Sequence, residues 1–394
     1  MNVLQKLAPP TGESSSASSV ANHSAVGPTY FADEAARLAS FARSLDALHA
    51  EIDADLGAED VAHIRRVVRL ARVTEIAGRT LIHVSLDPIT FTLGVASLSV
   101  HKLLMLMEIG HTVLHGAYDK LPGAEPYRSE SFRWKAPVDE KSWCRGHNVR
   151  HHQYTNVAGR DPDLDFGLLR LSDRIRYSAV HRLQPVSNWV SWFFFSTAIN
   201  LHVTGMLEIY MKPDETQLRT RKSVKAITVA HVAFLRKQLR YYTREYVFFP
   251  ALAGPMFRKT LLGNGLSEVV RDVYAAAIIY CGHVGAEDYP PETRGRSRAG
   301  FYVLQVEGTC DVDLPPPPCR YLRARSTSKS STTCFHACRP TVCGRSRRGS
   351  KPSALRTGSS TRAVVGRVGS LSSRKPCTGC RLRTSRDRWP MTMR

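Results

Sequence analysis

Long apolar runs alternate with polar segments over most of the first 314 residues. The four longest runs cover residues 81–107, 189–211, 246–262 and 266–281. Each is close to the roughly 20 residues that a helix needs to cross ~30 Å of hydrocarbon, although Pro88, Pro250 and Pro255 interrupt some of them. The pattern therefore predicts an all-α fold, an integral membrane helical bundle, in which the Gly-Asn-Gly segment at 263–265 joins the last two runs.

The segment before these runs has a helical period. From Tyr30 to about Arg72, Ala, Leu and Val recur every three or four residues, which predicts amphipathic helices. Such helices fit a membrane surface and an ordinary soluble helix pair equally well. Residues 1–30 are rich in Ser, Ala and Pro and lack the pattern of a signal peptide, so we expect them to be disordered.

Residues that flank the runs indicate their orientation. Trp189, Trp192 and the phenylalanines at 193–195 are typical of an interfacial belt at the start of a span. Residues 212–245 carry nine Lys and Arg, which predicts a cytoplasmic position for this linker.

Composition divides the chain near residue 314. Residues 1–314 hold 36 Lys and Arg against 33 Asp and Glu, whereas residues 315–394 hold 19 against one, Asp387. The second part also contains six of the nine cysteines and almost no apolar periodicity, so it cannot bury a core. It is expected to be a disordered basic tail. Its attraction to nucleic acid or anionic lipid would be nonspecific and salt-sensitive, so we expect no specific nucleic-acid partner.

Histidines supply the chemistry. His111 and His115 lie in HTVLH, and His147, His151 and His152 lie in HNVRHH. The pairs at i, i+4 spacing stack imidazoles on one helix face, and imidazole is a ligand for Fe, Zn, Cu and Ni. Five such groups exceed the three or four protein ligands of a single zinc site, which suggests two metals. The zinc-protease signature HExxH is absent. The isolated His101 and His202 are expected to be ordinary core residues.

These segments resemble the membrane fatty acid desaturases. MEIGHTVLHG and RGHNVRHHQYTNVAGRDPDLDFG are similar to the first two histidine boxes of that family, in its bacterial branch, and the match runs from about residue 60 to 314. The resemblance implies a non-haem di-iron centre (two Fe ions) that uses O₂ to remove two hydrogens from an acyl chain. It assigns the five histidines as iron ligands and places them in a helical cap on the cytoplasmic side of the cell membrane.

Further residues join this assignment. The resemblance implies one more ligand after the last membrane helix, and His283 in IIYCGHVGAE is the candidate. Asp161, Asp163 and Asp165 could orient the N–H groups of the ligand histidines, or they could form a solvated, capped turn. An EF-hand is excluded because Phe166 stands where that loop needs Gly.

The third histidine box of the family is missing from residue 315 onward. Reading residues 328–344 with a one-base shift permits LQIEHHLFPRLPPNRLR, and the four prolines at 315–318 imply a C-rich stretch where a base could be lost. As written, the chain has Ser331, Thr332 and Thr333 where adjacent histidines are expected. We therefore interpret residues 31–314 as an incomplete desaturase domain followed by an out-of-frame tail. The expected consequence is weak iron occupancy and little or no turnover.

The sequence also indicates which partners such an enzyme needs. No GxGxxG or GxxxxGKS/T motif occurs, so electrons must come from an external donor such as a ferredoxin or a flavin reductase. The resemblance implies a fatty acyl substrate linked to CoA or to lipid. Two alternatives remain open. One is a lipid hydroxylase with the same histidine boxes, and the other is a non-catalytic membrane protein with a basic tail.

Overall fold

The computed structural model describes residues 28–210, 224–283, 286, 288–291, 293 and 297–309. These residues belong to one unit, Met1–Thr341. Throughout the described part of the chain the regular secondary structure is helical, and the β-pairing is limited to the isolated bridges Val157–Tyr289 and Asp165–Arg170. This confirms the all-α prediction for these residues. The predictions for residues 1–27 and for the tail at 315–394 lie outside them.

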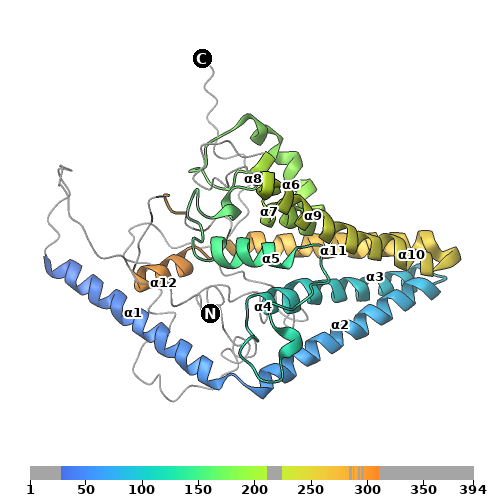
Figure 1. The fold of residues 1–394 in the computed structure, drawn as a ribbon, viewed down its shortest axis with the longest axis horizontal. Coiled ribbons are helices and arrows are strands. Elements are labelled where there is room, and N and C mark those ends of the chain that lie inside the picture. Colours follow the sequence, from blue (N-terminus) through green and yellow to red (C-terminus); the bar gives the residue numbers. More distant parts are fainter. Residues whose placement is uncertain are drawn as a thin grey trace. The chain divides into compact units, whose positions relative to one another are not determined.

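Two long helices open the described chain (Figure 1). They are α1 (Pro28–Asp55) and α2 (Ala58–Val84), and they cover the segment in which amphipathic helices were expected. The carboxylate of Asp60 accepts a hydrogen bond from the N–H of Gly57 at 3.1 Å, which fixes the start of α2. Phe41 and Leu45 are buried on α1, as are Val61 and Ile64 on α2, so each helix has one packed face.

The longest apolar helix follows a tight reversal. Asp87 caps α3 (Pro88–Leu103) by accepting from the N–H of Thr90, and Pro88 takes the first helical position, where a missing N–H costs nothing. The helix continues through η2 (Leu104–Gly110) and α4 (His111–Leu114). Among the described helices, only this 27-residue stretch, Pro88–Leu114, is long and apolar enough to cross a membrane.

Helices α2 and α3 form a close hairpin, and α11 runs along α3 (Figure 1). The approach depends on small residues, because a Cβ on Gly78 would lie 2.6 Å from the backbone nitrogen of Leu98. A Cβ on Gly94 would meet the backbone nitrogen of Ile82 at 2.8 Å. Any side chain at either position would push the two helices apart.

The apolar run at 189–211 is not one span, so that prediction was wrong. It covers the second half of α6 (Gln184–Phe193) and then α7 (Phe195–Val203) and α8 (Met206–Tyr210). The backbone leaves the helical region at Phe194, with φ −121° and ψ 36°, and turns again at Gly205, whose φ of +84° suits glycine. Helix α7 instead buries Phe195 and Asn200 inside the protein.

The expected break at residues 263–265 was also wrong. Helix α11 runs unbroken from Phe257 to His283. Asn264 is buried and donates from its amide to the carbonyl of Glu245, while Gly263 lets Ile82 approach, since a Cβ there would lie 2.9 Å from Ile82 Cδ1. Residues that usually end a helix are here packing and hydrogen-bonding positions.

The remaining elements complete the chain. Helix α9 (Val224–Thr243) leads into the prolines at 250 and 255 through shorter turns, and α12 (Arg298–Glu307) is the last described helix. The shorter elements are η3 (Glu125–Tyr127), α5 (Glu140–Trp143), η4 (Cys144–His151), η5 (Pro162–Leu164), η6 (Ala179–Leu183), η7 (Arg244–Phe248), α10 (Phe249–Leu252) and η8 (Gly254–Met256).

A buried ionic network joins α2, α3, η7 and α11. Arg79 contacts Glu245 at 3.0 Å, and Glu268 lies 2.6 Å from both Lys102 Nζ and Arg271 Nη2. Arg271 is 1% exposed, so these charges are stabilised by one another rather than by water. No pattern in the sequence predicts this network.

Candidate metal centre

The first histidine pair lies where an irregular helix returns to α-geometry. η2 is a π-helical segment that ends at Gly110, and His111 and His115 follow on α4 and its C-cap. Their Nε2 atoms lie 3.3 Å apart. π-helical turns widen a helix locally and occur often at functional sites, where they redirect side chains. The i, i+4 spacing therefore brings the two imidazoles together as expected.

The second histidine group lies on another π-helical segment, η4. His147 and His151 stack with ring centroids 5.2 Å apart and an interplanar angle of 22°. In addition, His147 Nε2 lies 3.1 Å from His152 Nε2, although the two residues are five positions apart. A π-helix places residues i and i+5 one above the other, so His152 joins the cluster through the local backbone geometry.

The two histidine groups contact each other through edge-on and tilted ring pairs. The ring of His115 lies 5.2 Å from that of His147 and 4.9 Å from that of His152, and His111 lies 5.3 Å from His147. Ligand nitrogens of His111, His115 and His147 all lie within 4.8 Å of one another, and the same holds for His147, His151 and His152. The structure thus brings all five predicted histidines into two overlapping sets that share His147.

The donor geometry fits metal binding. Two nitrogens bound to one ion at about 2.1 Å lie about 3.0–3.4 Å apart, depending on the angle between them. The Nε2 separations of 3.1 and 3.3 Å fall in that range. An all-imidazole set suits Fe, Zn, Cu or Ni.

Two of the three predicted aspartates contact the cluster. His151 Nδ1 lies 3.0 Å from both carboxylate oxygens of Asp161 and 3.4 Å from Asp163 Oδ2. Asp161 is 1% exposed and accepts from the backbone N–H of Asn156 and of Asp163, so it is not part of a solvated turn. Asp161 is also the N-cap of η5, and Asp165 accepts from the N–H of Gly167 at 3.2 Å, so part of the capped-turn alternative is present as well.

The burial of Asp161 has an electrostatic consequence. Loss of hydration raises the pKa of its carboxyl above the ordinary value, while the adjacent His151 imidazole acts in the opposite direction. A carboxylate held against a ligand's Nδ1 orients the imidazole ring, so that Nε2 presents its lone pair to the cluster.

His202 is a site residue that the sequence does not reveal. It was expected to be an ordinary core histidine, and it is indeed buried. Its Nε2, however, lies 3.1 Å from Asp163 Oδ1, and its ring stacks on Phe166 at 4.0 Å. His202 thus contacts, through Asp163, the same network that holds His151. By contrast, His101 lies 2.7 Å from the carbonyl of Ala71 and has the core role that was expected.

An indole pair forms one wall of the cluster. The ring of Trp143 lies 4.4 Å from His147 and packs edge-on against His111 and His115. Trp134 packs edge-on against Trp143 and donates from Nε1 to the carbonyl of Met105 at 2.8 Å. Gly110 makes room for Trp134, since a Cβ there would lie 1.8 Å from Nε1.

Helix α12 ties the second histidine group to the end of the described chain. The amide of Gln305 donates to the carbonyl of His152 at 3.0 Å, and its oxygen accepts from Thr155. Asn156, with a φ of 57°, donates to the carbonyl of Gly308. These contacts hold the segment that precedes residue 314 against the histidine cluster.

His283 and the expected third box have no described geometry. His283 is the last residue of α11, but its side chain lies outside the described part of the chain, as do residues 328–344.

Fold and site together define a helical protein with a histidine cluster that could hold a metal ion. The chain is 30% identical over 289 residues to the NADPH-dependent stearoyl-CoA 9-desaturase of Mycobacterium tuberculosis, a match that covers 71% of this chain and 65% of that protein. It is 38% identical over 64 residues to the Delta(5) fatty acid desaturase A of Dictyostelium discoideum, which covers 16% of this chain and 14% of that one. It is 34% identical over 88 residues to the sn-1 linoleoyl-lipid 6-desaturase of Arthrospira platensis. That match covers 22% of this chain and 23% of that protein.

By these matches the chain is similar to the fatty acid desaturases, a family of oxidoreductases. It spans just under two thirds of the length of its mycobacterial relatives. No family model matches the chain, and no solved structure resembles it significantly.

Proposed function

We propose that this chain carries the core of an O₂-dependent fatty acid desaturase, which introduces a double bond into an acyl chain linked to CoA or to lipid. The observation that supports it is the convergence of five imidazoles from two separate segments, with Nε2 pairs at 3.1 and 3.3 Å. The desaturase names of the relatives supply the reaction class.

Two iron ions are the metals we propose for the site. His111, His115 and His147 would hold one, and His147, His151 and His152 border the other. Bound iron with O₂ supplies an oxidant strong enough to break an unactivated C–H bond, which no side-chain base can do at neutral pH. His283 is the candidate for a sixth ligand.

The protein's own residues have three roles in this proposal. Asp161 and Asp163 orient His151. Trp143 covers the histidine rings on one side and keeps water from them. Gln305 and Asn156 hold α12 near the cluster, from where the chain would continue into the third histidine box of a complete enzyme.

A membrane location is part of the proposal. Besides the Pro88–Leu114 helix, large apolar side chains on the outer faces of the bundle are exposed, and water would not favour so many of them. They include Leu70, Val73, Ile76, Leu86, Ile89, Leu93, Val232, Leu239, Leu252, Leu262 and Val270. The proposed electron donor is external, a ferredoxin or a flavin reductase.

The test compares this chain with a version whose reading frame is restored by one added base after the codons for 315–318. Each would be purified in detergent, assayed for iron and supplied with a labelled acyl substrate and an electron donor. We expect about two Fe and a double bond in the restored protein, and little iron or product from the chain as written. Restored His111→Ala should lose iron, whereas His231→Gln, which lies outside the cluster, should keep it.

The outcomes are distinct. A single zinc or no metal in the restored protein contradicts the proposal. An added oxygen instead of a double bond would favour the hydroxylase alternative. Full activity of the chain as written would show that the third box is dispensable.

A further inference from the structure

Helix α6 exposes apolar side chains on more than one side. Val186 is 66% exposed, Trp189 64% and Phe194, at its end, 58%. No Asp, Glu, Lys or Arg occurs anywhere in residues 183–207. A surface helix in water normally has a charged outer face, and α6 has none.

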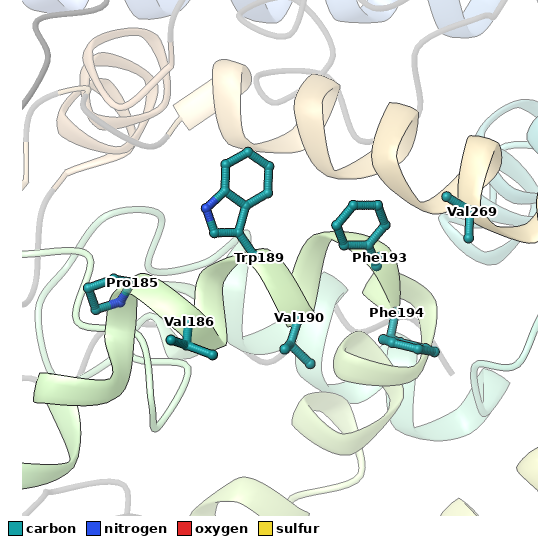
Figure 2. A pocket seen from close by; sticks show the side chains of 7 residues that line it. All are labelled: Pro185, Val186, Trp189, Val190, Phe193, Phe194 and Val269. Atoms are coloured by element: carbon teal, nitrogen blue, oxygen red, sulfur yellow. The ribbon is translucent and has the colours of Figure 1, made fainter.

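Two faces of α6 are involved (Figure 2). Trp189 and Phe193 point toward α11. They line a hollow of about 620 Å³ together with Val269 of α11 and with Pro185, Val186, Val190 and Phe194 of the α6 segment. Val186 and Val190 point away from α11. Side chains of both orientations line the same hollow, and fluid acyl chains can fill it and surround the helix.

A basic segment borders the apolar helix. The stretch before α6, residues 170–182, carries four arginines against one aspartate. Arg176 and Arg182 are exposed, and so are Tyr177 and Val180 between them. Alternating cationic and apolar side chains at the edge of an apolar helix are typical of segments that bind anionic membrane surfaces.

The helix is too short to cross a membrane. It has 10 residues, about 15 Å of helix, and the chain breaks at Phe194 before α7 turns into the protein. Trp192, on the inner side of α6, stacks on Tyr280 of α11 with ring centroids 5.7 Å apart. One side of α6 is therefore anchored to the bundle.

We propose that α6 lies in the membrane surface, along the plane of the bilayer, with lipid acyl chains around Val186, Trp189 and Val190 and filling the α6–α11 hollow. Arg176 and Arg182 contact anionic headgroups at its edge. The interfacial tryptophan belt is thus a lateral lipid-binding face instead of the start of a span. This inference requires the proposed membrane location but not the metal centre.

The test uses tryptophan fluorescence of the full chain in nanodiscs that contain lipids brominated either near the headgroup end or near the methyl end of the acyl chain. Subtracting the spectrum of Trp189→Phe from that of the unmodified chain isolates Trp189. We expect quenching about twofold stronger from the shallow bromines, because an interfacial helix penetrates only ~5–10 Å. Trp192→Phe is the matched control, and its difference signal should be quenched less.

Arg182→Gln tests the headgroup contact. Adding anionic lipid to neutral nanodiscs should increase the quenching of Trp189 by brominated lipid in the unmodified chain. In Arg182→Gln the same addition should produce a smaller increase. Stronger quenching by the deep bromines would overturn the inference in favour of a spanning position. Quenching by aqueous iodide alone, or protection from both quenchers, would overturn it in favour of water or of a protein partner. A chain that remains in the nanodisc in those cases retains the proposed membrane location, so the two failures are distinguishable.

Discussion

His202 Nε2 lies 3.1 Å from Asp163 Oδ1, although the two residues are on different elements and 39 positions apart. The other carboxylate oxygen of Asp163 faces His151 Nδ1 at 3.4 Å. One aspartate thus links a buried core histidine to a histidine of the candidate metal centre.

Removing His202 should therefore weaken metal binding. Groups that orient a ligand typically change metal affinity by about 10-fold to 100-fold, so we expect His202→Leu to lower Co²⁺ affinity by about 10-fold. His202→Gln keeps a hydrogen-bond donor for Asp163, so this variant should retain most of the Co²⁺ affinity. Optical titration with Co²⁺ measures both. Equal losses in the two variants, or none in His202→Leu, would contradict this role, and thermal unfolding of each variant separates it from a folding defect.

Gly110→Ala should disturb the wall of the cluster. A methyl group there would overlap the Trp134 indole and break its hydrogen bond to the carbonyl of Met105. Overpacking a core contact typically costs about 1–3 kcal/mol. We expect a lower free energy of unfolding and a changed Trp emission spectrum. An unchanged spectrum would mean that Trp134 does not lie against Gly110.

The continuity of α11 can be tested with two neighbouring glycines. Gly263→Ala should destabilise the protein, because its Cβ would lie 2.9 Å from Ile82, whereas a Cβ on Gly265 meets nothing within 4 Å. Within a helix, Ala is favoured over Gly by about 0.5–1 kcal/mol, so Gly265→Ala should stabilise. Thermal unfolding in detergent compares them. If 263–265 were a linker, Gly265→Ala would bring no gain.

The ionic network should be sensitive to loss of one partner. Glu268→Gln leaves Lys102 and Arg271 with less compensating charge in a buried site, which typically costs about 3–5 kcal/mol. Lys135→Gln removes a partly exposed pair with Glu75, which is worth at most about 1 kcal/mol. Denaturant unfolding of both variants checks the contrast, and similar small effects would show that the network is not closed to water.

Cys144 should be an unreactive thiol. Burial raises its pKa to about 11, and its Sγ donates to the carbonyl of Leu114. Against an ordinary value of 9.0, that shift leaves about 100-fold less thiolate at neutral pH. The folded state binds this proton more tightly than the unfolded state, so its contribution to stability should fall as pH rises from 9.0 to about 11.

Peptide-resolved alkylation across that pH range measures the Cys144 reaction. The same peptide in denaturant is the control and should react with a midpoint near the ordinary thiol value. Coincident profiles for the folded and unfolded chain would contradict the burial of Cys144.

The sequence by itself determined the donor residues of the candidate site and the helical class of the fold. The histidines at 111, 115, 147, 151 and 152 are close in the chain within each box, so the local helical backbone brings the members of a box together. The same motifs carried the family resemblance, which the comparisons bear out. The spacing of residues along one helix does not depend on how that helix packs. These two inferences therefore did not require knowledge of the tertiary structure.

Only the tertiary structure decided how the boxes meet and what surrounds them. The approach of His115 to His152, the contact of His202 with Asp163 and the pairing of Glu268 with Lys102 join residues far apart in the chain. The same dependence explains the two wrong predictions. The buried hydrogen bond of Asn264 keeps α11 continuous through the Gly-Asn-Gly segment. The packing of α7 buries part of an apolar run inside the protein, where a membrane span was expected. In each case the observed conformation is stabilised by contacts with segments far away in the sequence. A local sequence pattern does not predict such contacts.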